Sequence, residues 1–104
     1  MSEAEIEKEI QEKGLNAQRL TPGLINSTIQ KEAFHVFEDS QLTVCCLTLK
    51  NGFTITGESA CASPENFNAE LGEKIARENA RNKVWMLEGY LLKQKLYETS
   101  KNED

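Results

Sequence analysis

The longest regular pattern of apolar residues lies in the last third of the chain and predicts one long helix. Phe67, Leu71 and Ile75 recur there every four positions, and the pattern resumes after the polar stretch 77–83 with Val84, Leu87, Leu91, Leu92 and Leu96. Ser63 is a suitable N-cap, and Pro64 suits the first helical position because its missing N–H costs no hydrogen bond there. We therefore expect a helix over residues 63–97, with Gly89 as a point where it can bend.

A strip of small residues runs along one face of this helix. Gly72, Ala76 and Ala80 follow one another at steps of four, and Ala80 is the only apolar side chain in the polar stretch 77–83. One interpretation is that the strip seats a neighbouring helix or a second copy of the chain. The other is that it admits a small anionic ligand, held by the cations and amides beside it. Spacing alone favours the first interpretation.

Two short helices are predicted at the start of the chain. Residues 3–13 are rich in helix formers, and Gly14 ends that segment. Thr21 then caps a second helix that opens with Pro22. The buried side of this second helix is predicted to hold three apolar residues, Leu24, Ile25 and Ile29.

Turn residues and short apolar runs predict a three-stranded antiparallel sheet within residues 33–59. The strands are expected over 33–37, 41–50 and 53–58. Asn51-Gly52 predicts a two-residue hairpin loop, since that loop needs positive φ at both positions. The corresponding register pairs Lys50 with Phe53, Thr48 with Ile55 and Leu47 with Thr56. Both sheet faces then carry apolar residues, so we expect the long helix on one and the first two helices or another subunit on the other.

These elements predict one α+β domain over residues 1–104. It comprises a helical part over 1–31, the antiparallel sheet over 33–59, the long helix over 63–97 and a frayed polar tail over 98–104. A chain of 104 residues with 38% apolar and 7% aromatic residues has little core to spare, so oligomerisation is an expected source of further burial.

Charge and the apolar pattern exclude several classes of protein. A net charge of -5 argues against a general nucleic-acid or membrane-surface binder. The chain has no apolar run long enough to span a bilayer and no basic and apolar leader, so we expect a cytoplasmic protein.

The sequence also lacks the motifs of common catalytic and cofactor sites. Its three cysteines cannot all pair and have no zinc-type spacing, and His35 has no companion nucleophile at a recognisable spacing. Phosphate-loop and dinucleotide-binding glycines and a nucleophile elbow are missing. We therefore expect no enzyme, no cofactor and no metal.

Several motifs together resemble a family of small accessory proteins of tailed phages, over roughly residues 17–96. They are Arg19-x-Thr-Pro22, the hairpin stretch from Thr43 to Ala60, Glu65-Asn-Phe-Asn68, Gly72-Glu-Lys-Ile-Ala76, Glu78-Asn-Ala80, Lys83-Val-Trp85 and Glu88-Gly-Tyr90. The resemblance extends to the Thoeris anti-defence sponges, which bind a cyclic ADP-ribose-type immune signal without degrading it. Those proteins place a small antiparallel sheet ahead of long helices and assemble as dimers and larger rings, with ligand at the subunit interfaces.

The resemblance implies a phage-encoded counter-defence protein that sequesters a cyclic nucleotide or cyclic ADP-ribose-type signal in the host cytoplasm, as a dimer or a trimer of dimers. A protein-interaction module that inhibits a host protein, or an accessory protein of another function, is the alternative. Candidate ligand contacts, chosen for their chemistry within the matching motifs, are Arg19, Thr21, Asn66, Phe67, Arg77, Asn79, Arg81 and Lys83. The cations would hold the pyrophosphate and Asn79 the sugar or base. Phe67 is either a stacking platform or a core residue, and its spacing favours core.

Overall fold

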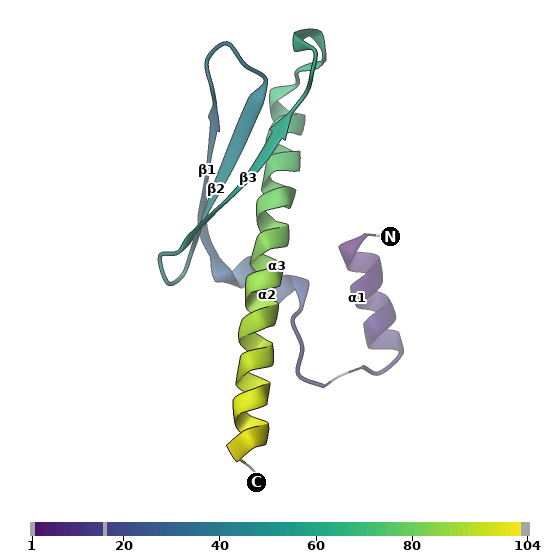
Figure 1. The fold of residues 1–104 in the computed structure, drawn as a ribbon. Coiled ribbons are helices and arrows are strands. Elements are labelled where there is room, and N and C mark those ends of the chain that lie inside the picture. The colour runs from purple at the N-terminus through teal and green to yellow at the C-terminus, as the bar shows by residue number, and fades with distance from the viewer. Residues whose placement is uncertain (1, 16, 103–104) are drawn as a thin grey trace. The chain divides into compact units, whose positions relative to one another are not determined.

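The computed structural model describes residues 2–15 and 17–102 and confirms the α+β fold (Figure 1). The elements are α1 (Glu3–Glu12), α2 (Pro22–Thr28), β1 (Ile29–Val36), β2 (Leu42–Leu49), β3 (Thr54–Ala60), the 3₁₀ turn η1 (Pro64–Asn66) and α3 (Ala69–Asn102). The strands form one antiparallel sheet in the order β1-β2-β3. The chain divides into two compact units, residues 28–84 and residues 1–27 with 85–104.

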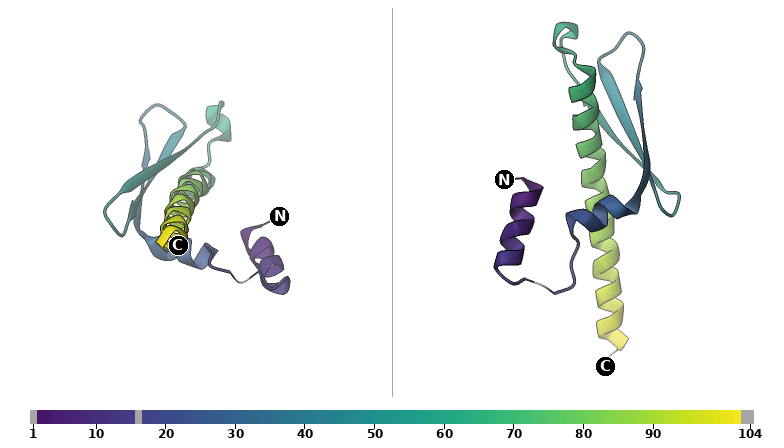
Figure 2. Two further views of the ribbon diagram at one scale, coloured as in Figure 1. Left: turned by 60° about the horizontal axis from the view of Figure 1, so that its bottom comes forward. Right: turned by 180° about the vertical axis from the view of Figure 1, so that it is seen from behind.

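The sheet of the 28–84 unit has a buried face that lies against the first half of α3 (Figure 2). Along β2, burial alternates strictly, and the buried set is Thr43, Cys45, Leu47 and Leu49. Ile55 joins this set from β3, and Ala76, Ala80 and Val84 join it from α3. Because strand side chains alternate between faces, this single row places the core of the unit between the sheet and α3.

Ala76 and Ala80 of the small strip on α3 pack against the chain's own sheet, so neither a second copy nor a ligand occupies that part of the strip. Ala76 and Ala80 are fully buried within the single chain. A Cβ atom built on Gly57 of β3 would lie 2.4 Å from the Ala76 carbonyl oxygen and 2.2 Å from the Ala80 nitrogen. Helix and sheet backbones therefore approach each other as closely as they do because residue 57 has no side chain.

The β2–β3 hairpin has a three-residue loop, which corrects the predicted register by one residue. Leu49 N–H donates to the Phe53 carbonyl at 2.8 Å, and the register continues with Thr48 opposite Thr54 and Leu47 opposite Ile55. Gly52 has a φ of 89°, whereas Asn51 is not at positive φ and instead accepts from Phe53 N–H through Oδ1 at 3.0 Å. One glycine at positive φ is what a three-residue loop requires.

The long helix begins later and ends later than predicted. Ser63 makes no capping hydrogen bond, and Phe67 is extended (ψ 129°), so Pro64 opens only the short turn η1. Asn68 is the residue whose side chain caps α3, because its Oδ1 accepts from Leu71 N–H at 2.9 Å. The helix is continuous through Gly89 and extends to Asn102, past the predicted end at Tyr97. The predicted frayed tail is therefore helical as far as Asn102, while its last residues, 103–104, lie outside the described residues.

The first strand also begins earlier than predicted, at Ile29 instead of residue 33, so Ile29 belongs to β1 and not to the buried side of α2. Within α2, Ile25 is buried as predicted, whereas Leu24 is 45% exposed. Thr21 does cap α2, because its Oγ1 accepts from Leu24 N–H at 3.1 Å.

In the unit formed by residues 1–27 and 85–104, α1 makes several polar contacts. Ser2 and Glu5 form a capping box at its start, and Gly14, with a φ of 67°, follows its end as predicted. No residue of α1 is buried. Its Glu3 carboxylate accepts from Trp85 Nε1 at 3.2 Å, and Glu7 pairs with Arg19.

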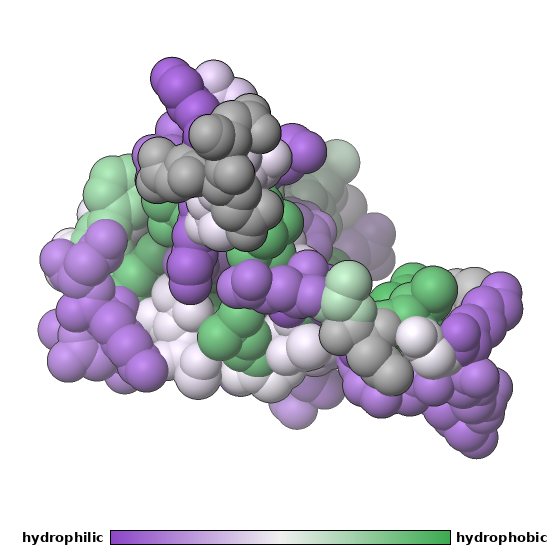
Figure 3. All heavy atoms as spheres, turned by 90° about the horizontal axis from the view of Figure 1, so that it is seen from below, coloured by the Kyte–Doolittle hydropathy of each residue, from purple (hydrophilic) through white to green (hydrophobic). Residues whose placement is uncertain are grey.

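Large apolar side chains reach the surface on the second half of α3. Met86, Tyr90, Leu91 and Tyr97 are each more than half exposed. In the view of Figure 3, apolar side chains emerge among polar ones. No helix in the described part of the chain is both long enough and apolar enough to cross a bilayer.

Candidate functional site

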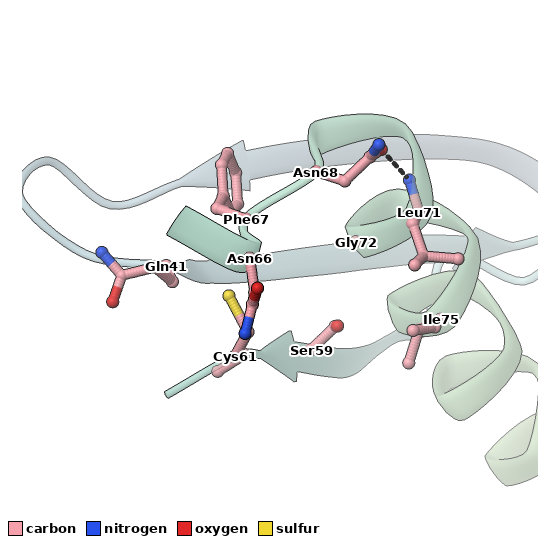
Figure 4. Close-up of a pocket in the computed structure, with 10 residues that line it drawn as sticks. Gln41, Ser59, Cys61, Asn66, Phe67, Asn68, Leu71, Gly72 and Ile75 are labelled. Carbon is pink, nitrogen blue, oxygen red and sulfur yellow. Dashed lines mark hydrogen bonds between the residues drawn. The ribbon is translucent and has the colours of Figure 1, made fainter. Parts of the chain in front are cut away.

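One pocket of the 28–84 unit lies where the end of β3 meets the start of α3 (Figure 4). It has a volume of about 90 Å³. Its lining comes from the residue before β2, the end of β3 and the linker after it, η1, and the first turns of α3. These residues are Gln41, Ser59, Ala60, Cys61, Asn66, Phe67, Asn68, Leu71, Gly72 and Ile75.

Local structure explains why polar and apolar side chains meet at this pocket. The chain connects the end of β3 to the start of α3 through the η1 turn. Phe67 follows this turn in an extended conformation and separates it from α3. Leu71 and Ile75 lie one turn apart on the helix, and their side chains are 54% and 43% exposed. Phe67, at 36% exposure, is therefore a half-open side chain in the pocket wall and not a buried core residue.

The pocket is electrically neutral, because none of its lining side chains is charged. Asn66, Gln41 and Ser59 offer amide and hydroxyl groups, while Phe67, Leu71 and Ile75 offer apolar surface. The beginning of α3 adds the partial positive charge of a helix N-terminus. Such a lining suits a flat group with a polar edge, such as a nucleobase, better than it suits a pyrophosphate.

Two of the eight predicted site residues, Asn66 and Phe67, line the pocket. The predicted cations bind within the chain. Arg77 forms a two-point ion pair with Glu32, at 2.8 and 2.9 Å, and its guanidinium lies 5.2 Å from the Phe34 ring centre. This pair lowers the pKa of Glu32. Arg81 is only 8% exposed.

Asn79 and Lys83 support the free edge of the sheet. Asn79 Nδ2 donates to the Glu58 carbonyl at 2.8 Å, and Lys83 Nζ donates to the Thr56 carbonyl at 2.6 Å. Both carbonyls belong to β3, an edge strand whose outward backbone groups would otherwise be unpaired by the sheet. These two side chains therefore have a structural task in the single chain.

Arg19 and Thr21 belong to the other unit. Arg19 donates to the Glu7 carboxylate through Nη1 and Nη2, at 2.8 and 2.7 Å, and also donates to the Leu15 and Leu20 carbonyls. The Arg19 hydrogen bonds, with one from Gln11, lower the pKa of Glu7 to about 2. Arg19 is thus engaged in a salt bridge with Glu7, and Thr21 is engaged as the cap of α2.

The remaining lining residues were not among the predicted site residues. Cys61 Sγ lies in the wall and donates to the Ser63 carbonyl at 3.3 Å. The abundance of small residues over 57–62 is the one sequence signal for this region, since small side chains allow close approach to a backbone. Among the described residues no cluster of His, Cys, Asp and Glu side chains could hold a metal ion.

Comparison with known proteins identifies a family. The model of the phage protein (N4 Gp49/phage Sf6 gene 66) family matches residues 20–96. This match spans most of the chain, so the chain belongs to that family. Comparisons of this chain with the curated proteins and with the solved structures found no match.

Proposed function

We propose that this phage protein binds a cyclic nucleotide or cyclic ADP-ribose-type signal and sequesters it without cleaving it. The observation that carries the proposal is the neutral pocket at the start of α3, where an aromatic ring and amide side chains meet. A nucleobase needs a stacking surface and hydrogen-bonding groups for its edge, and Phe67 and Asn66 supply these two kinds of contact.

The size of the pocket limits what it holds. Its volume of about 90 Å³ is well below the roughly 300–1,000 Å³ typical of small-molecule sites. The pocket of one chain therefore receives one ring of the ligand, and the rest of the ligand lies across the opening. The similarity to proteins that bind such signals at subunit interfaces supports a homo-oligomer, a dimer or a trimer of dimers, in which a second copy completes the site.

The anionic part of the ligand has one favourable location near the pocket. The first N–H groups of a helix lack partners within the helix, and they attract phosphate. At the start of α3, Asn68 accepts from Leu71 N–H through its side chain and from Gly72 N–H through its carbonyl, so the pyrophosphate would approach the earlier N–H groups, those of residues 69 and 70. The pyrophosphate would lie beside the first turn of α3, while Arg77 continues to bind Glu32.

A thermal-shift screen of the full chain against cyclic dinucleotides and ADP-ribose isomers tests the proposal. A ligand at 100 times its dissociation constant adds about 2.7 kcal/mol of stability, which is a shift of roughly 10 °C or more for a chain of this size. Phe67→Ala should weaken binding by about fivefold to about 150-fold, because stacking of one base contributes roughly 1–3 kcal/mol. Phe53→Ala is the matched control, since Phe53 is an exposed aromatic residue outside the pocket lining.

Binding that is equally weakened by both substitutions, or unchanged by Phe67→Ala, would place the ligand elsewhere. If wild-type protein binds none of these compounds, the sequestration proposal fails. The alternative function, inhibition of a host protein, has its own support in the large apolar side chains exposed on the second half of α3, including Met86 (69%) and Tyr90 (70%). Exposed apolar surface of this kind is typical of protein-binding sites.

A further inference from the structure

A buried hydroxyl group lies directly behind the pocket. Thr43 of β2 is fully buried, and within the part of the chain that the structure describes its Oγ1 has no hydrogen-bond partner. Buried polar side-chain atoms are nearly always hydrogen-bonded, because an unpaired one has lost its hydration without compensation. Valine has almost the same shape as threonine and has no hydroxyl to bury. The stability of the fold therefore does not explain why residue 43 carries a hydroxyl.

Two residues of the pocket lining flank this hydroxyl. Ser59 of β3 is the register partner of Thr43, so the two side chains are neighbours on the same face of the sheet. Gly72 of α3 approaches Thr43 from the helix, because a Cβ atom built on Gly72 would lie 3.0 Å from the Thr43 Oγ1. Both Ser59 and Gly72 line the pocket (Figure 4). The Thr43 hydroxyl is thus one residue away from the pocket on two sides.

Gly72 also departs from what stability favours. It lies near the start of the 34-residue helix α3, where alanine would favour the helix more than glycine does. The space that its missing side chain leaves open ends at the Thr43 hydroxyl. An unpaired hydroxyl and a helical glycine therefore lie against each other at the edge of one pocket. Departures from local rules that coincide in this way are typical of functional sites.

We infer that the Thr43 hydroxyl selects the ring that enters the pocket, by a hydrogen bond to the inner edge of that ring beside Gly72. The inference rests on the proposed function, because it assigns a specificity-determining contact to the same pocket. In this structure the hydroxyl is covered. The half-buried Ser59 side chain makes no hydrogen bond to any described residue, so it turns aside without losing a partner and uncovers the hydroxyl.

The size of the pocket decides which edge of a purine nucleoside reaches Thr43. Its volume of about 90 Å³ admits one ring. The sugar of a purine nucleoside is attached to the five-membered ring, so that ring stays at the opening and the six-membered ring enters. The edge of the six-membered ring carries ring nitrogens and, in adenine, an amino group. A threonine hydroxyl can donate to the first and accept from the second. The ligand class is therefore a purine nucleotide with hydrogen-bonding atoms on this edge.

Adenosine is the probe, because it carries this edge and no phosphate, and nuclear magnetic resonance titration of the full chain follows its binding. Thr43→Val should raise the dissociation constant of adenosine by about fivefold to about 150-fold, because the buried edge atom loses its partner. Thr43→Ser keeps the hydroxyl and should stay within about threefold of wild type. Thr48→Val is the matched control, because it makes the same change on β2 outside the pocket lining and should leave binding unchanged.

Gly72→Ala and a second probe test the contact from its other sides. Gly72→Ala should weaken adenosine binding at least about fivefold, because its Cβ would stand beside the Thr43 hydroxyl. Benzimidazole riboside keeps the two-ring shape and the sugar of adenosine but lacks the polar atoms of the six-membered edge. Wild type should bind it at least about fivefold more weakly than adenosine, and Thr43→Val should bind the two compounds equally.

Urea unfolding of the same variants separates binding from folding. Thr43→Val should be at least as stable as wild type, because it removes an unpaired buried hydroxyl. A clear loss of stability would mean that the hydroxyl already has a partner in the chain, and it would overturn the inference.

The binding results overturn the inference in several ways that leave the proposed function standing. They do so if wild type binds a compound of the thermal-shift screen but not adenosine, or if Thr43→Val or Gly72→Ala binds adenosine within about twofold of wild type. They also do so if Thr43→Ser loses as much affinity as Thr43→Val, or if Thr43→Val still prefers adenosine to benzimidazole riboside. A wild type that binds neither adenosine nor any compound of the screen overturns the inference and the proposed function together.

Discussion

Adding one methyl group at Gly57 tests how closely α3 and the sheet approach each other. In Gly57→Ala the new Cβ would lie 2.2 Å from the Ala80 nitrogen, 2.4 Å from the Ala76 carbonyl oxygen and 2.8 Å from the Ala80 Cα. All three atoms are backbone, so no side chain can rotate away. Overpacking a core usually costs about 1–3 kcal/mol. We expect about 3 kcal/mol or more here, because the helix itself has to move away from β3.

Gly72→Ala is the matched control at another point of the packing between α3 and the sheet. Its Cβ would lie 3.0 Å from the Thr43 hydroxyl oxygen, so the neighbour has to move by only a few tenths of an ångström, and alanine favours the helix by roughly 1 kcal/mol over glycine. We therefore expect the free energy of unfolding to change by no more than about 1 kcal/mol. Urea unfolding followed by circular dichroism measures both variants. If Gly57→Ala stays within about 0.5 kcal/mol of wild type, the close approach of Gly57 to α3 is wrong.

Two further substitutions test the assigned cap and the Glu7–Arg19 pair. Asn68→Ala should cost about 1 kcal/mol of unfolding free energy by removing the α3 cap, while Ser63→Ala should cost none through capping; equal costs in urea unfolding would contradict the assignment. Because the pKa of Glu7 is lowered to about 2 in the folded chain, its stabilising contribution is present above its ordinary pKa of 4.5 and is lost as the pH falls toward 2. Thermal unfolding followed by Trp85 fluorescence measures the difference in stability between wild type and Glu7→Gln. This difference should shrink over that pH window, and a difference that does not depend on pH would refute the pair.

Local signals predicted the elements of this chain better than they predicted its contacts. The strand order, the caps Thr21 and Gly14 and the long helix follow from short-range propensity. The hairpin register does not, because Asn51 can either adopt positive φ or accept a hydrogen bond from Phe53 N–H, and the two choices differ by one residue in pairing. The start of α3 was misplaced for a similar reason, since Ser63 and Asn68 are both good caps by composition.

The candidate site was harder to predict because charged residues have partners far away in sequence. Arg77 and Glu32 are 45 residues apart, and no spacing rule connects them. The small strip on α3 was recognised as a place of close approach, but its partner Gly57 lies on a different element. Asn66 and Phe67, which were chosen for their chemistry within the matching motifs, line the pocket.

Recovery of intact ligand from the protein tests the central claim most directly. The full chain is incubated with an excess of each cyclic nucleotide or ADP-ribose isomer, freed of unbound compound by gel filtration and then denatured by heat. Mass spectrometry of the supernatant should find one compound of this class, chemically unchanged, at a fixed ratio to the chain, and much less of it with Phe67→Ala. A supernatant that contains none of them, or only cleavage products, would contradict sequestration.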